Sequence, residues 1–269
     1  MLHAGDLINE GFDDALWGEW CDGLGFFGAM MANMPAVGNH DMNLPEGSGA
    51  LPSAANPLWK AHFALPQNGP ADTPLLEDEA YWVDYQGVRF ICLEANAYTP
   101  EDYDPEARKI AQAKQIPWVK SLLENNPNRW TVILQHEPMY QVGKNADNPE
   151  LREAFLALYD KYHVDLVLQG HDHVYARSHK LAGGKVVGDA APGTVYVVSV
   201  SGPKMYPFNP VYADLMKKTI ADTQLFQIVA VTGDHIRLNT YATGNEWVDG
   251  FELKKNKDGG SVLSELSKP

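Results

Sequence analysis

The chain has 269 residues, of which 45% are hydrophobic, and this is enough for one large α/β domain or two small ones. Its formal net charge of −14 argues against a nucleic-acid backbone as the main partner. No apolar run is long enough to cross a membrane, and the N-terminus shows no signal-peptide pattern. Cys21 and Cys92 do not by themselves indicate a disulfide.

The chain opens with strand-like residues 1–4, followed by Gly5-Asp6. A carboxylate directly after a strand and a glycine is well placed to bind a metal ion, although Asp6 as the N-cap of the next helix is the alternative. Apolar residues at helical spacing predict that helix over about residues 13–31.

A short strand, 34–37, leads into Gly38-Asn39-His40-Asp41. The Asn39 carbonyl oxygen is a neutral metal ligand, and His40 is placed to act as an acid beside the metal. A plain turn is the alternative for this motif. A one-metal nuclease hairpin is disfavoured because the flanking ββα pattern is absent.

The segment 43–79 is rich in proline, and we expect it to form a wall or lid that helps to select the substrate, together with loop 97–105. His62 within it is interpreted as structural. Strands at 80–85 and 88–95 and a helix at 106–125 follow. A continuous apolar strand, 130–134, then delivers His136, for which a core histidine is the alternative.

Asn148-Pro149 is a typical N-cap and first helical residue, and it starts a helix that ends near His163. The strand 164–168 follows and leads into Gly170-His171-Asp172-His173. Side chains at i and i+2 at a strand end point the same way, so His171 and His173 can aim two imidazoles at one small volume.

The last part of the chain is expected to be mostly antiparallel, with strands at 174–181, 195–200, 225–232, 235–242 and 246–253. Residues 254–269 are polar and are expected to form a frayed tail. Residues 1–253 are therefore predicted to be one folded domain that carries all of these motifs.

The motifs share one feature, which is their position just past an apolar strand. In α/β sheets the carboxyl ends of the strands are where sites are built, and a set of carboxylate, amide and imidazole ligands fits Mn, Fe or Zn. The predicted ligands are Asp6, Asn39, His136, His171 and His173.

These motifs, in this order, resemble those of the calcineurin-like metallophosphoesterases, and most closely the branch of the purple acid phosphatases. The resemblance covers nearly the whole chain. It implies an α/β (α+β) fold, a four-layer α/β/β/α sandwich of two mixed sheets. It also implies that the chain lacks the first strand and motif of the family, and it leans towards a secreted or periplasmic protein.

The resemblance also implies roles. Asp6 would bridge two metal ions, one held by Asn39, His136 and His171 and the other by His173. His40 would contact phosphate and the leaving group. The purple enzymes have a tyrosine ligand three residues after the bridging aspartate; here that residue is Asn9, so no tyrosinate–iron colour is expected.

The implied activity is hydrolysis of a small-molecule phosphate ester through in-line attack by a metal-bridging hydroxide. Phosphodiester or nucleotide hydrolysis within the same superfamily, and a weakly active or non-catalytic metal-binding fragment, are the alternatives. A metallo-β-lactamase-type hydrolase is disfavoured because no early His-x-His-x-Asp-His run is present. The residues expected around the metal ligands or in the cleft wall are Asp41, Asp172, Tyr140, Tyr175 and Arg177, with packing as the alternative for the last three.

Overall fold

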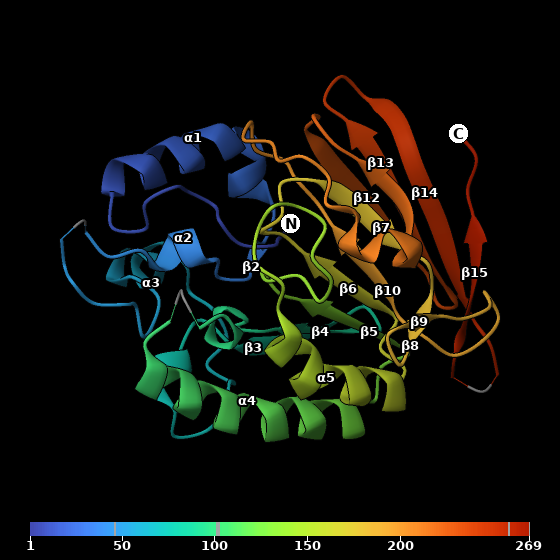
Figure 1. The fold of residues 1–269 in the computed structure, drawn as a ribbon, viewed down its shortest axis with the longest axis horizontal. Helices are drawn as coiled ribbons and strands as arrows, with labels where there is room; N and C mark the ends of the chain where they lie inside the picture. Colours follow the sequence, from blue (N-terminus) through green and yellow to red (C-terminus); the bar gives the residue numbers. More distant parts are fainter. Residues whose placement is uncertain (46, 101–102, 258, 269) are drawn as a thin grey trace.

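Two β-sheets packed face to face form the centre of the molecule (Figure 1). The computed structural model describes residues 1–45, 47–100, 103–257 and 259–268. The larger sheet has seven strands, in spatial order β11 (Met216–Ile220), β7 (Tyr175–Ser178), β10 (Val195–Val198), β6 (Leu166–Gln169), β5 (Trp130–Leu134), β4 (Val88–Cys92) and β3 (Tyr81–Tyr85). Its strands β4, β5, β6 and β10 run parallel to one another, so their carboxyl ends share one edge.

The second sheet has four antiparallel strands, β12 (Leu225–Val231), β13 (His235–Ala242), β14 (Glu246–Lys255) and β15 (Ser261–Glu265). Two short pairs complete the strands: β1 (Leu2–His3) with β2 (Met34–Pro35), which run parallel, and β8 (Leu181–Ala182) with β9 (Lys185–Val186). The hydrophobic core between the two large sheets includes Val132, Leu166 and Phe251.

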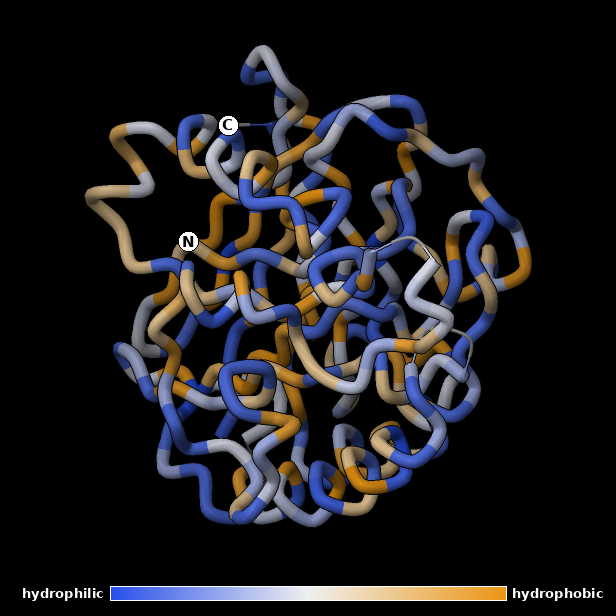
Figure 2. The backbone as a smooth tube through the Cα atoms, turned by 90° about the vertical axis from the view of Figure 1, so that its left-hand side faces the viewer, coloured by the Kyte–Doolittle hydropathy of each residue, from blue (hydrophilic) through white to orange (hydrophobic). Residues whose placement is uncertain are grey.

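Two long helices cover the other face of the seven-stranded sheet, α4 (Pro105–Glu124) and α5 (Pro149–Lys161) (Figure 1). Hydrophobic and hydrophilic residues alternate along the helical turns at the bottom of Figure 2, as expected for helices with one face on a sheet. The Asn148 side chain caps α5 as the sequence predicts, and the Asp104 side chain, for which no cap was predicted, accepts hydrogen bonds from the first turn of α4 in the same way.

The remaining helical elements are one helix near the N-terminus of the chain and several short segments. They are α1 (Asp14–Met30), α2 (Asn39–Met42), α3 (Pro57–His62) and three 3₁₀ turns at Pro74–Leu76, Asn96–Tyr98 and Pro210–Leu215. An aromatic cluster joins α1 to α3. In it the ring of His62 stacks on Trp17 with the centroids 4.9 Å apart, which agrees with a structural role for this histidine. Within the described residues, no helix is long and apolar enough to cross a membrane.

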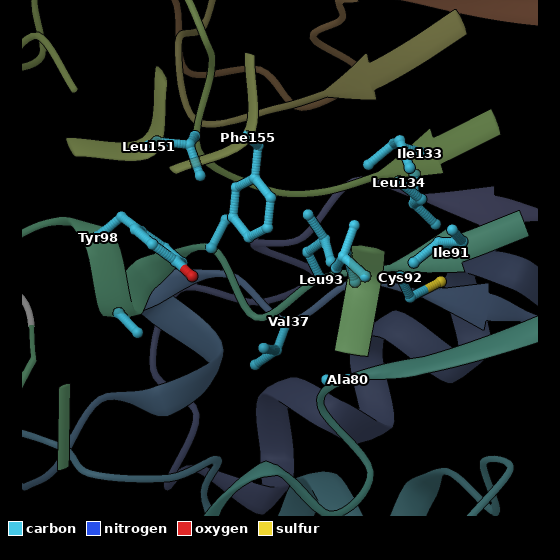
Figure 3. Close-up of a cluster of buried hydrophobic side chains, with 14 of the residues drawn as sticks. Val37, Ala80, Ile91, Cys92, Leu93, Tyr98, Ile133, Leu134, Leu151 and Phe155 are labelled. Atoms are coloured by element: carbon cyan, nitrogen blue, oxygen red, sulfur yellow. The ribbon is translucent and has the colours of Figure 1, made fainter. Parts of the chain in front are cut away.

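Side chains from the strands and helices interlock in the core under α5. Figure 3 shows Phe155 of α5 beside side chains of the β4 and β5 region, such as Leu93 and Ile133. The Phe155 and Tyr98 rings meet edge to face with their centroids 5.2 Å apart. Val37, which precedes the Gly38-Asn39 motif, belongs to the same cluster, so the core reaches directly to one of the predicted ligand loops.

The structure confirms the predicted α/β class and the predicted face-to-face packing of two sheets. Four details differ from the prediction. The second sheet is entirely antiparallel, its outer face leaves Phe226 and Ile228 exposed, and β11 was not anticipated because Met216–Ile220 has no clear apolar alternation. The expected single strand 174–181 is divided into β7 and β8.

The expectation of a frayed C-terminal tail is wrong for residues 261–265. They form β15, which pairs with β14 from Phe251 to Lys255. This strand forms because every second side chain is buried. Those of Ser261 and Leu263 are buried, and Leu263 belongs to the core between the sheets. Val262, Leu263 and Leu266 are the apolar residues of an otherwise polar segment, and they are too few to predict a strand.

Tyr175 and Arg177 bind the second sheet. The sequence suggested a place in the wall of the metal cleft for them, with packing as the alternative, and the structure shows packing. Arg177 is 1% exposed and pairs with Asp249 through Nε and Nη2 at 2.7 and 2.9 Å, and with Glu265 at 2.8 Å. The Tyr175 hydroxyl donates to Asp249 at 2.7 Å. Burial alone would raise the pKa of Asp249, but Arg177 outweighs it and lowers that pKa.

This buried charge gives a prediction about stability. Asp249→Ala leaves the Arg177 guanidinium buried without its main partner, and we expect the free energy of unfolding to fall by about 3–5 kcal/mol. Glu265→Ala is the matched control. The Glu265 side chain is 45% exposed, so the loss should be about 1 kcal/mol or less. Urea titration of both variants measures this, and equal losses would contradict the assignment.

Candidate metal centre

Three parallel strands deliver polar residues to one edge of the seven-stranded sheet. The register pairs Cys92 with Leu134 and Leu134 with Leu168, so β4, β5 and β6 end at the same level. Beyond these ends come Glu94, His136 and His171. The amide of Gly170 donates to the His136 carbonyl at 3.0 Å, which fixes the last two loops against each other. The carboxyl-edge location that the sequence predicts therefore holds for these loops.

Two further loops arrive from the parallel pair β1–β2. Strand pairing places Leu2 opposite Met34 and His3 opposite Pro35, so the loops that carry Asp6 and Asn39 lie side by side. Asp6 is not the helix N-cap that was its alternative, because Asp13 caps α1. Asn39 begins the one-turn helix α2.

The buried carboxylate of Asp41 ties these two loops together. Its Oδ2 accepts hydrogen bonds from the Asp6 and Gly38 amides at 2.9 and 2.8 Å, and its Oδ1 accepts from the Leu7 amide at 2.9 Å. The sequence suggested that Asp41 orients an imidazole. The structure instead shows it binding the backbone of both ligand loops, one of which carries Asp6 and the other Asn39.

Glycine is required where these loops touch. A side chain at Gly38 would collide with the backbone nitrogen and carboxylate of Asp6, and one at Gly5 would collide with the His136 ring. Gly5 also has a φ of 85°, which disfavours any other residue. Asp6 and His171 themselves have φ of 53° and 62°, an uncommon conformation that non-glycine residues adopt mainly where the surrounding structure imposes it.

Four ligand-type atoms from four loops meet at His136. Its Nε2 lies 3.2 Å from Asn39 Oδ1, 3.3 Å from Asp6 Oδ1 and 3.2 Å from His171 Nδ1. The ligand atoms of Asp6, His136 and His171 all lie within 4.8 Å of one another. His136 is fully buried, and Asp6 and His171 are partly buried.

The chemistry of this group fits a metal ion. His136 Nδ1 lies 2.7 Å from the Ala4 carbonyl oxygen, which can only accept, so the neutral ring keeps its proton on Nδ1 and presents a lone pair at Nε2. Asn39 and Asp6 also direct oxygen atoms there. Lone pairs that face one another in a buried site repel unless a cation or a proton lies between them.

The charge states follow the same logic. Burial alone would lower the pKa of His136, but the negative charge of Asp6 outweighs it and raises that pKa to about 10. His136 in turn holds the pKa of Asp6 well below its usual range, against the effect of burial. Burial, together with the charge on His136, lowers the pKa of His171 to about 3, so this imidazole is neutral. Without a metal ion, a proton on His136 therefore occupies the place of a cation.

The other two predicted histidines flank this group. His40 contributes no ligand atom to this group. The His40 Nδ1 atom lies 2.7 Å from the Asn9 carbonyl oxygen, and the His40 backbone amide donates to Asp6 Oδ1 at 3.0 Å. His173 Nδ1 lies 2.8 Å from the Lys204 carbonyl oxygen, and its ring stacks on Tyr206 with centroids 4.3 Å apart. In both rings the carbonyl contact leaves Nε2 as the free acceptor.

Two more predicted residues have other roles. Asp172 is fully buried, but its Oδ2 accepts from the Val142 amide at 2.6 Å and so holds the loop after β5 instead of orienting an imidazole. Tyr140 is also buried, and its ring packs edge to face against Tyr196 and Tyr212. Packing, the alternative for Tyr140, is what the structure shows.

The sequence analysis assigned no role to two buried carboxylates near the site. Glu137 Oε1 lies 3.4 Å from His171 Nδ1. Glu94 accepts hydrogen bonds from the Asn96 and Ala97 amides, and the Asn96 side chain also donates to the carbonyl of Val37, just before Asn39. Burial raises the pKa of Glu94 to about 7. Their position in the sequence could have identified them, because both residues follow an apolar strand as the predicted ligands do.

Comparison with known proteins agrees with this geometry. Residues 1–175 match the family model of the calcineurin-like phosphoesterases, and the chain belongs to that family. An uncharacterized protein of Mycobacterium tuberculosis is 29% identical over 174 residues, covering 62% of this chain and 32% of that protein. Purple acid phosphatase 22 of Arabidopsis thaliana is 26% identical over 194 residues, covering 69% and 40%.

A solved structure shares the fold. The purple acid phosphatase PPD1 from yellow lupin (Lupinus luteus) seeds superimposes with a TM-score of 0.73 at 19% identity, over 96% of this chain and 47% of that one. The chain spans less than half the length of each of these three proteins. The family implies a dinuclear metal centre, and the group around His136 supplies residues suited to one metal ion of such a centre.

The first prediction for this site concerns metal retention. We expect His171→Ala and Asn39→Ala to lose metal while keeping the wild-type circular dichroism spectrum, because each removes one ligand atom from a preformed group. Metal per chain is measured by elemental analysis after desalting. His62→Ala is the control, since this ring stacks on Trp17 and should leave metal content unchanged. Full metal content in the two site variants would refute the centre.

The second prediction concerns pH. Metal binding must displace the proton of His136, whose pKa is about 10 in the metal-free protein. Below that value the proton competes with the metal, so affinity should rise by about tenfold per pH unit as pH increases through the neutral range. Calorimetry in two buffers of different ionisation enthalpy should show release of at least one proton. Binding that releases none would contradict this account.

Proposed function

We propose that the chain is a metal-dependent hydrolase of small-molecule phosphate esters. The observation that carries the proposal is the meeting of Asp6, Asn39, His136 and His171 around one point, with the tautomer of His136 set by the Ala4 carbonyl. Membership of the calcineurin-like phosphoesterase family supports the reaction type. The acid phosphatase of Aspergillus ficuum, 33% identical over 81 residues, supports a phosphate ester as substrate.

In this proposal Asn39, His136 and His171 would hold one metal ion, His173 would belong to a second, and Asp6 would be shared between them. Mixed carboxylate, amide and imidazole ligands suit Fe, Mn or Zn. When bound, the two ions supply Lewis acidity at the phosphoryl oxygens and make water acidic enough to attack phosphorus in line. The buried Asp41 keeps the Asp6 and Asn39 loops at a fixed separation.

His40 is proposed to protonate the oxygen that leaves. Its Nδ1–H donates to the Asn9 carbonyl and its backbone amide is bound to Asp6, so the ring is held beside the ligand group without belonging to it. To act as the acid, the ring must carry a second proton at Nε2, and that proton would pass to the departing oxygen, which returns Nε2 to the acceptor state. A positioned general acid of this kind contributes about 10²–10⁴-fold to the rate.

The test combines metal content and turnover on one sample. We expect the purified chain, loaded with Mn, Zn or Fe, to bind up to two metal ions and to hydrolyse p-nitrophenyl phosphate. One tightly bound ion without turnover would support the alternative of a non-catalytic metal-binding protein. Absence of both would refute the proposal for this chain.

His40→Ala separates chemistry from metal binding. We expect kcat to fall by about 10²–10⁴-fold with unchanged metal content, because in this proposal the ring serves the leaving oxygen and is not a metal ligand. Asn9→Ala is the matched control, since it removes a side chain but keeps the carbonyl that orients His40. Loss of metal in His40→Ala would instead make this histidine a ligand.

A further inference from the structure

The strand β2, which leads into the Asn39 loop, has one neighbouring strand among the described residues, β1. The amides of Met34 and Ala36 donate to the segment that carries β1, at 2.9 and 2.8 Å. The hydrogen-bonding direction alternates along a strand, so the carbonyls of Pro35 and Val37 face the opposite way. On that side no described strand pairs with them, and their hydrogen bonds must come from elsewhere.

Two buried side chains of the seven-stranded sheet and its loops supply these hydrogen bonds. The Tyr81 hydroxyl, at the start of β3, donates to the Pro35 carbonyl at 2.8 Å. Asn96 lies in the 3₁₀ turn after β4, and its Nδ2 donates to the Val37 carbonyl at 3.2 Å. The same nitrogen lies 3.4 Å from Met42 Sδ. Asn96 therefore contacts the chain on both sides of the Gly-Asn-His-Asp motif that carries one of the proposed ligands.

Glu94 sets the direction of the Asn96 side chain. Its Oε1 accepts from Asn96 Nδ2 at 2.7 Å, and its Oε2 accepts from the Ala97 amide at 2.9 Å. Because the Val37 carbonyl can only accept, the nitrogen of the Asn96 amide must point towards it. The Asn96 Oδ1 atom has no hydrogen-bond partner among the described residues. The donor contacts alone therefore decide how this buried side chain is oriented.

Glu94 is in turn tied to the sheet edge that carries His136. The amide of Leu93 donates at 3.0 Å to the carbonyl of Leu134, two residues before His136. The Gln115 side chain of α4 binds the Glu94 backbone twice, accepting from its amide at 3.1 Å and donating to its carbonyl at 2.9 Å. A path of covalent and hydrogen bonds therefore joins the two ligand loops independently of any metal ion.

We propose that Asn96 is a positioning residue for the metal centre, which holds the Asn39 loop at a fixed distance from His136. Tyr81 assists it from the neighbouring carbonyl. The inference rests on the proposed function, in which Asn39 and His136 share one metal ion. Asp41 fixes the Asn39 loop to the adjacent ligand loop, whereas Asn96 fixes it to the seven-stranded sheet. Residues that orient metal ligands in this way typically contribute about 10–100-fold to metal affinity.

Asn96→Ser tests this role, because serine is too short to reach the Val37 carbonyl but keeps a hydroxyl for Glu94. Zn²⁺ is titrated into the full chain by calorimetry, and we expect the affinity to fall by about 10–100-fold. Tyr98→Phe is the matched control, since the Tyr98 hydroxyl is buried in the same 3₁₀ turn and has no partner within the described residues. Wild-type Zn²⁺ affinity in Asn96→Ser overturns the inference.

Ile236→Val separates positioning from stability. Ile236 is fully buried in the core between the two sheets, so removing one methylene there lowers the stability of the fold without touching either ligand loop. This variant should keep the wild-type Zn²⁺ affinity, with its loss of stability measured alongside by urea titration. If it loses as much affinity as Asn96→Ser does, the effect is one of general stability and the inference is wrong.

Hydrogen exchange in the metal-free chain gives a readout that needs no metal binding. The amides of residues 38–43 should exchange faster in Asn96→Ser than in the wild type, whereas those of β14 should not. Tyr81→Phe deletes a single oxygen and should accelerate the same amides, which decides the question if Asn96→Ser does not fold. Equal acceleration in both regions, or none in either, contradicts a positioning role.

The two proposals fail differently. If the wild type binds no metal ion, the proposed function is wrong, and hydrogen exchange still decides whether Asn96 fixes the loop. If the wild type binds metal and hydrolyses p-nitrophenyl phosphate while Asn96→Ser keeps the wild-type affinity, only the role of Asn96 is wrong.

Discussion

The candidate site depends on one buried carboxylate, Asp41. It accepts three backbone hydrogen bonds, two from the loop that carries Asp6 and one from the loop that carries Asn39. Burial and the nearby charge of Asp6 raise the pKa of Asp41 to about 7, so the three amide donors only partly offset the cost of placing this group here. What Asp41 contributes is a fixed separation of the two loops, because the short strands β1 and β2 could not fix these loops alone.

The site combines several local conformations that are unfavourable in isolation. Asp6 and His171 have positive φ, Gly38 contacts the Asp6 carboxylate too closely for any side chain, and lone pairs of four residues face one another. Such features persist only where surrounding structure imposes them, and here the hydrophobic core reaches Val37 at the base of one loop. A cation relieves the repulsion, which is why this arrangement indicates a metal centre more strongly than any single motif does.

The proposed ligands and the loop predicted to select the substrate are held by different parts of the fold. The ligand loops follow strands of the seven-stranded sheet and of the β1–β2 pair, whereas the end of the proline-rich loop after α2 is held by Tyr103 and Asp104. The second sheet lies on the opposite face and is joined through the buried Arg177–Asp249 pair.

Local pattern determined much of this protein by itself. Strand–glycine–polar motifs mark Asp6, Asn39 and His171, and a position just past an apolar strand marks His136, because strand ends and turns depend on neighbouring residues. Periodicity marks α4 and α5, and a continuous apolar run marks β5, for the same reason. Tertiary structure alone decided which groups face the ligands. Glu94 and Glu137 approach through packing, Tyr175 and Arg177 turn to the other sheet, and Asp41 binds backbone amides instead of an imidazole. Those contacts join residues far apart in the chain, and the direction of a side chain across such a distance follows from sheet register and packing, which no local pattern contains.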